Sequence, residues 1–232
     1  MPRTRRWAAA LSAMALAPPL YAQDARPVIV VLPFENSGSY GQDKENFEAL
    51  ELGLPAILAA TLAAHPGARV ADQGGVREAM GREQVGATGR VDAGSASRVA
   101  KAAGARYAVT GSFADFYGKF RINARVVDAQ TGEILKVVSN DDPKLQDRAQ
   151  LGAIVQLVGD RVVAAIGLPP YPAAVAARLR GMPADALTQY SRGLLFESRG
   201  DKPKAAEAYQ RALTAYPDYP EAREGLQRAR GA

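Results

Sequence analysis

The chain of 232 residues contains no cysteine and a single histidine, His65. The first absence excludes disulfides and removes the thiol to which a lipid anchor would be attached. The second excludes any mechanism that needs two histidines within one chain, and both together remove the usual ligands of zinc and iron. His65 precedes Pro66 at the expected end of a helix, where we expect it to have a surface or capping role.

The motifs of the common enzyme classes are missing as well. The chain has no GxSxG elbow, no SxxK pair, no P-loop, no GxGxxG fingerprint and no DxDxDG loop, although it contains 22 glycines. The glycine-rich residues 86–94 lie between two expected helices, so we interpret their glycines as turn formers. We therefore expect no catalytic residue, no cofactor and no metal site.

Basic residues exceed acidic ones, and the formal net charge is +5. Three of the 29 basic side chains, Arg3, Arg5 and Arg6, lie in the first 22 residues, which contain no acidic residue. Removing these three leaves 26 basic against 24 acidic side chains. This excess is too small to indicate a nucleic acid or an anionic membrane surface as the partner.

Residues 1–22 have the pattern of a secretory signal peptide. A basic start is followed by an apolar run of about 13 residues and by small Ala22. The run is shorter than the roughly 20 residues of a spanning helix, and Pro18 and Pro19 end it. We expect cleavage after Ala22 and a soluble periplasmic protein with no lipid anchor and no integral membrane segment.

The apolar pattern predicts an α/β domain over residues 23–167. Residues 26–36 read as a central strand that is covered on both faces and closed by Pro33. A helix, a short strand and two more helices are expected to follow over residues 45–67, 68–73, 74–88 and 92–105. Pro55 implies either a kink in the first of these helices or the first turn of a second helical segment. The last of these helices is expected to be capped near Asp92 or Ser95.

Three strands then alternate around tight turns, over residues 106–117, 119–128 and 134–139. A helix over residues 141–167 is expected to cover the apolar face that carries Ile122, Ala124 and Val126. The fold class is thus α/β, a mixed sheet with an antiparallel meander covered by helices. The aromatic residues of this segment are Tyr107, Phe113, Phe116, Tyr117 and Phe120. We expect their rings to pack in the core and to anchor turns rather than to stack on nucleic-acid bases.

A small all-α appendage is expected over residues 184–232, after a proline-rich linker of residues 168–183. Its residues resemble a tetratricopeptide repeat followed by a capping helix, and the agreements are Gly193, Phe196, Gly200, Ala205, Tyr209, Ala212 and Pro217. Fewer than about three repeats rarely stand alone, so this one should lean on the α/β domain, on a partner subunit or on a bound peptide.

Two sets of residues are candidates for binding. The resemblance to the repeat family implies a groove that binds a partner through Leu187, Tyr190, Leu194 and Glu197. The alternative is that Tyr190 and Leu194 only pack on the α/β domain. An acidic cluster follows the first strand, and we expect solvated loop charges there rather than a ligand site; its members are Glu35, Asp43, Glu45 and Glu48.

Residues 77–113 and 120–135 resemble the curli secretion channel family of the bacterial outer membrane, and residues 28–36 are similar to the amino-terminal domain of TolB-like proteins. Channel members are lipoproteins with long membrane-spanning hairpins. This chain has no cysteine and only a tight turn at Gly118 and Lys119, so the resemblance implies a soluble variant. The proteins that this chain resembles also include periplasmic proteins that dock on other envelope proteins.

These observations favour a non-catalytic periplasmic adaptor whose partner is an envelope protein or peptide. One alternative is a soluble accessory of a curli-like secretion or surface assembly system that forms a homo-oligomeric ring. Another is a small-ligand receptor or enzyme that uses the acidic cluster after the first strand.

Overall fold

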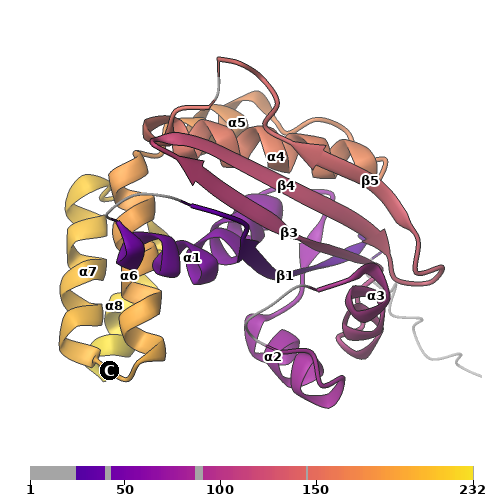
Figure 1. The fold of residues 1–232 in the computed structure, drawn as a ribbon, viewed down its shortest axis with the longest axis horizontal. Coiled ribbons are helices and arrows are strands. Elements are labelled where there is room, and N and C mark those ends of the chain that lie inside the picture. The colour runs from indigo at the N-terminus through magenta and orange to yellow at the C-terminus, as the bar shows by residue number, and fades with distance from the viewer. Residues whose placement is uncertain (1–24, 40–42, 87–90, 145, 232) are drawn as a thin grey trace, which may run out of the picture.

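The computed structural model describes residues 25–39, 43–86, 91–144 and 146–231. The predicted leader, residues 1–22, and its cleavage after Ala22 lie outside these ranges. The described residues form one mixed sheet with helices packed on both of its faces (Figure 1). This arrangement confirms the predicted α/β class.

The sheet has the strand order β2-β1-β3-β4-β5 (Figure 1). β1 (Val28–Asn36) runs parallel to its two neighbours, β2 (Arg69–Val70) and β3 (Tyr107–Phe116). β3, β4 (Lys119–Asp128) and β5 (Ile134–Ser139) form the predicted antiparallel meander. The sheet therefore ends in a two-residue strand on one side and in a six-residue strand on the other.

β1 is covered on both faces, as its unbroken apolar run predicts. Ile29 and Val31 belong to one buried hydrophobic cluster, whereas Val30 and Leu32 belong to the other. Successive side chains of a strand point to opposite faces, so this division follows directly from the sequence.

The prediction that Pro33 closes this strand is wrong. The pairing with β3 continues to Asn36, with a register shift between Val31 and Phe34. Such an irregularity accommodates a proline, which has no N–H for the ladder.

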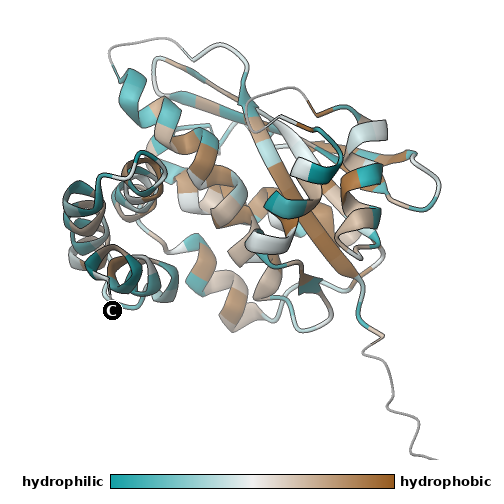
Figure 2. Ribbon diagram, turned by 90° about the horizontal axis from the view of Figure 1, so that it is seen from below, coloured by the Kyte–Doolittle hydropathy of each residue, from teal (hydrophilic) through white to brown (hydrophobic). Residues whose placement is uncertain are grey.

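Two helices lie on each face of the sheet. α1 (Lys44–Ala63) and α4 (Leu151–Ala165), which is preceded by the short 3-10 turn η1 (Arg148–Gln150), share one hydrophobic cluster with β4. α2 (Gln73–Arg82) and α3 (Ala93–Ala102) lie against β1 on the other face. Figure 2 shows brown, apolar positions along the strands and on the adjoining helices, with teal on the outer surfaces.

The two short helices begin at the aspartates that precede them. The Asp72 carboxylate accepts a hydrogen bond from the N–H of Gly75, and the Asp92 carboxylate accepts one from the N–H of Ser95. Asp92 is therefore the N-cap that the sequence indicates, and these bonds satisfy donors that a helix start leaves unpaired.

α1 is long and apolar enough to cross a membrane by length and composition alone. In the structure it is a core helix, with Leu50, Leu54, Leu58 and Leu62 buried. It runs unbroken through Pro55.

Residues 168–183, predicted to be a linker, contain the helix α5 (Ala173–Arg180), which buries Ala176 and Leu179 beside α4. Tyr171 precedes it and donates a hydrogen bond from its hydroxyl to the Thr61 carbonyl, 3.0 Å away. The prolines therefore lead into a packed helix rather than an exposed connection.

His65 is buried, so the predicted surface role is wrong. Its Nδ1 atom accepts a hydrogen bond from the Gly67 N–H, and its Nε2 atom lies 2.9 Å from the Pro169 carbonyl. The ring also packs edge-on against Tyr171. The histidine thus ties the end of α1 to the segment that enters α5.

The C-terminal part consists of α6 (Ala184–Ser198), α7 (Lys202–Ala215) and α8 (Pro220–Arg230). α6 lies against α1 so closely that a Cβ added at Gly53 would be 1.8 Å from the Ser191 Oγ. The buried cluster of the α/β part continues through this contact into the three helices. The predicted appendage therefore leans on α1 of the α/β part, which is one of the three supports that the sequence allows.

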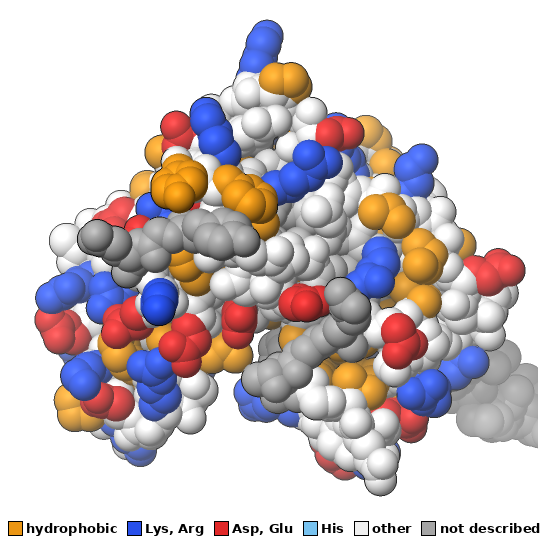
Figure 3. Space-filling model, in the orientation of Figure 1, with side chains coloured by type: hydrophobic (Ala, Val, Ile, Leu, Met, Phe, Trp, Pro, Cys, Tyr) orange, Lys and Arg blue, Asp and Glu red, His pale blue; other side chains and the backbone are white. Residues whose placement is uncertain are grey.

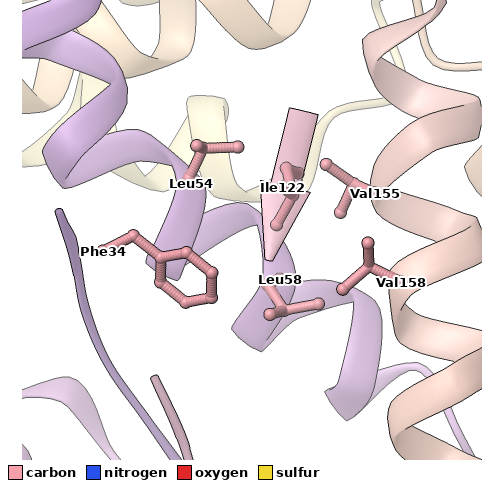
Figure 4. A pocket seen from close by; sticks show the side chains of 6 residues that line it. All are labelled: Phe34, Leu54, Leu58, Ile122, Val155 and Val158. Carbon is pink, nitrogen blue, oxygen red and sulfur yellow. The ribbon is translucent and has the colours of Figure 1, made fainter. Parts of the chain in front are cut away.

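The layer between α1, α4 and the sheet contains a void of about 10 Å³. It is lined by six apolar side chains (Figure 4): Phe34, Leu54, Leu58, Ile122, Val155 and Val158. A void of this size without polar partners does not hold an ordered ligand.

Candidate functional site

The four residues of the predicted groove lie on α6, where the chain's own helices cover two of them. Leu187 and Tyr190 are 1% and 6% exposed. The Tyr190 ring packs against Tyr209 of α7 and against Tyr219, which precedes α8, at centroid distances of 5.9 and 5.0 Å. A partner can contact Leu187 and Tyr190 only after the helices packed over them move, and partner binding by the four residues stays a prediction.

Leu194 and Glu197 keep part of their surface, and Glu197 is bound within the chain. Its carboxylate accepts a 2.6 Å hydrogen bond from the Tyr209 hydroxyl and two from Arg228 of α8, at 2.9 and 3.2 Å. Burial acts to raise the pKa of Glu197, but the hydrogen bonds from Arg228 and Tyr209 outweigh it, so the pKa lies below its ordinary value. Glu197 thus fastens α7 and α8 to α6.

The acidic cluster after the first strand is paired with arginines rather than simply solvated. Asp43 lies 2.9 Å from Arg148, and Glu45 lies 2.7 Å from Arg192. Glu48 makes a similar contact of 2.7 Å with Arg199 of α6. Because each of these carboxylates faces a different arginine, on η1 or α6, they do not converge on a common ligand.

Glu35, the remaining member, follows Phe34 on β1, and Phe34 belongs to the hydrophobic cluster shared with α1. Alternation along the strand therefore places Glu35 on the opposite face of the sheet. Among the described residues, no group of three potential metal ligands occurs. A surface pocket of about 350 Å³ beside α5 has apolar walls with Asp160 and Arg180 as its charged residues, and no residue of the acidic cluster lines it.

One face of the sheet is open where β3, β4 and β5 extend beyond α2 and α3. Ile122, Ala124 and Val126 of β4 are buried against α4, as predicted, so the alternate residues of β4 point to the opposite side. These are Lys119, Arg121, Asn123 and Arg125. Figure 3 shows orange and blue side chains next to one another over this part of the sheet. We call this surface, together with the β3–β4 turn and β5, the open face.

The β3–β4 turn places aromatic side chains at one end of the open face. Phe113 and Phe120 are buried, as predicted, whereas Phe116 is 47% and Tyr117 is 89% exposed. The expectation of core packing is therefore wrong for these two. The alternation of β3 assigns Phe116 to the face opposite Phe113, which is the signal that could have separated them.

Tyr117 also has an unusual backbone conformation. It and Gly118 form the two-residue turn, with φ angles of 53° and 87°. Both values are typical of a type I′ turn, for which asparagine and glycine are the preferred residues. An aromatic residue with positive φ is uncommon and strained, so packing and turn geometry do not explain Tyr117.

No protein-family model matches the sequence, and no curated protein matches it. Among solved structures, the NMR structure of Escherichia coli LpoB is similar over 60% of this chain and 79% of its own, with 13% identity and a TM-score of 0.40. TolB from Acinetobacter baumannii is similar over 62% of this chain and 29% of its own, with 18% identity and a TM-score of 0.41. The PelC dodecamer from Paraburkholderia phytofirmans gives 63% and 90% coverage, 16% identity and a TM-score of 0.32. Likenesses at this level do not establish a family.

Proposed function

We propose that the chain is a non-catalytic protein-interaction protein of the bacterial envelope, and that it docks on an envelope partner through the open face. The observation that carries the proposal is Tyr117, which is 89% exposed and holds a positive φ. Strain of this kind costs on the order of 1–3 kcal/mol, and residues that carry it cluster at functional sites.

The surroundings of Tyr117 have the composition of an interface. Phe116 lies beside it, and Lys119 and Arg121 follow on the same face. Tyrosine, phenylalanine and arginine are enriched in protein interfaces, and exposed apolar groups that gather on one face mark interaction sites. The envelope location rests on the predicted leader, residues 1–22.

The test is photocrosslinking in intact cells of the native host, from a photoreactive residue placed at position 117. A second probe at position 194 tests the predicted groove on α6, and a control probe at exposed Lys101 of α3 samples the remote surface. We expect the probe at position 117 to capture one identified envelope protein that the control does not. Capture of this chain alone would favour the ring-forming accessory, and capture from position 194 alone would move the docking site to the C-terminal helices.

A further inference from the structure

The two edges of the sheet differ in how they are protected. β2 pairs with β1 through only two residues, and so short an edge offers little backbone for pairing. β5 has six residues and forms the opposite edge. Three of its apolar side chains, Ile134, Leu135 and Val137, are 44%, 41% and 59% exposed. An edge strand of this length with exposed apolar side chains is a template on which another strand can pair.

The hydrogen bonds of β5 show which backbone groups face outward. The Asn140 N–H donates to the Ile122 carbonyl, so these two residues form a bonded pair at the end of the ladder. Bonded pairs recur every second residue in an antiparallel ladder, so Val138 and Lys136 also bond to β4. Val137 and Ser139 therefore direct their N–H and C=O groups away from β4.

One of these outward groups already has a partner. The Ser139 carbonyl accepts a hydrogen bond from Arg161 of α4, which also pairs with Asp141. Among the described residues, no hydrogen bond to the outward backbone groups of Val137 is found. An extended segment could therefore pair beside Val137, up to the position that Arg161 closes.

The charges around β5 define the chemistry of such a segment. Lys119, Arg121 and Arg125 lie on the open face, and Lys136 lies on β5 itself. None of these four cations forms an ion pair with another described residue. A second copy of this chain would bring further cations to the same edge, and like charges across a strand pair are destabilising. The acidic side chains of a strand paired with β5 would instead lie near cations on both faces of the sheet, since Lys136 points to the face opposite the three cations of β4.

We infer that β5 binds an extended, acidic segment of the envelope partner by strand addition, with aliphatic residues of the segment packed beside Val137. This inference rests on the proposed function and names the partner's chemistry. The backbone bonds would supply affinity, whereas the cations would select acidic side chains.

The test is photocrosslinking in the same cells from position 135, with the crosslinked peptide identified by mass spectrometry. We expect an acidic peptide of an envelope protein. Val137→Pro removes the outward N–H at an edge position, where proline is tolerated, and should lower the capture about tenfold. Val137→Thr keeps the N–H and the branched shape, so its capture should stay within about twofold of the unmodified chain.

Arg121→Glu provides a second test that leaves the β5 backbone intact, and it should lower the capture by a similar factor. Thermal melting of each variant checks that the sheet is folded. The inference is wrong if Val137→Pro and Arg121→Glu capture as much of the envelope partner as the unmodified chain does. It is also wrong if the crosslinked peptide is basic or comes from a second copy of this chain. If position 117 captures an envelope protein and position 135 captures nothing, strand addition fails while the proposed function stands; if neither captures anything, both fail.

Discussion

At the scale of single residues, the ring of Tyr209 shows how closely the C-terminal helices pack. It lies between Gly193 of α6 and Gly225 of α8, and a Cβ added at Gly193 would be 2.3 Å from the ring. We expect Gly193→Ala to lower the free energy of unfolding by about 1–3 kcal/mol, because the buried ring has no room to move. Urea denaturation measures this loss.

The matched control is Gly81→Ala in α2, where an added Cβ meets nothing within 4 Å. Alanine favours the helix by up to about 1 kcal/mol over glycine, so this variant should be unchanged or slightly more stable. An equal loss in both variants would show that the contact with Tyr209 is not the cause.

A second residue-scale prediction concerns Glu197. Burial acts to raise its pKa, but the hydrogen bonds from Arg228 and Tyr209 outweigh this and lower the pKa below its ordinary value. A carboxyl with a lowered pKa in the folded state stabilises the protein fully above its unfolded pKa, and this contribution is lost as the pH falls through the folded value. Glu197→Gln should therefore cost more stability at pH 7 than at pH 3.

Urea midpoints of the two proteins, measured across this pH range, give the difference. Glu207→Gln is the control, since Glu207 pairs with Arg211 on the exposed side of α7. Its effect on stability should be small because exposed pairs contribute little. A difference between Glu197→Gln and the unmodified chain that stays constant with pH would contradict the assignment.

At the scale of elements, the β3–β4 turn separates stability from function. Asparagine suits the first position of a type I′ turn better than Tyr117 does, so we expect Tyr117→Asn to raise the free energy of unfolding by about 0.5–1 kcal/mol. The same variant should lose partner capture by a photoreactive residue at Lys119, because the exposed ring is gone. Tyr117→Phe keeps the ring and should keep both properties; a Tyr117→Asn variant that still captures the partner would remove the turn from the docking site.

The sequence predicts most elements because their patterns are local. Alternation along β4 identifies Ile122 and Val126 as buried, and Asp92 marks the start of α3. α5 was missed because its eight residues are held by the packing of Ala176 and Leu179 near α4, and flanking prolines hide so short a helix. Tertiary packing of this kind leaves no local pattern.

For the candidate sites too, the sequence predicts which residues share a face but not whether that face is covered. The repeat pattern places Tyr190 and Glu197 on one face of α6, but it does not show that α8 covers this face. Alternation places Phe116 and Val137 on strand faces, but whether a helix covers those faces depends on where α2 and α3 lie. A sequence pattern defines a face, whereas its exposure is a property of the assembled fold.

At the scale of the whole molecule, the C-terminal helices and the α/β part share one hydrophobic cluster. Gly53 of α1 and Ser191 of α6 lie in direct contact, and two ion pairs, Glu45 with Arg192 and Glu48 with Arg199, flank it. These exposed pairs contribute little energy, so the apolar packing between α1 and α6 carries the coupling. The sequence-based division at residues 168–183 therefore does not separate two independent cores.

This shared core predicts that residues 25–231 unfold as one unit. Scanning calorimetry should give a single transition whose calorimetric and van't Hoff enthalpies agree, because neither part can lose the contact between α1 and α6 without exposing its own core. Gly53→Leu should split the transition in two, since its side chain would force α6 away from α1. Two transitions in the unmodified chain would mean that α6, α7 and α8 fold on their own and are joined to the sheet only by the chain. An unsplit transition in Gly53→Leu would show instead that the contact at Gly53 does not couple the two parts.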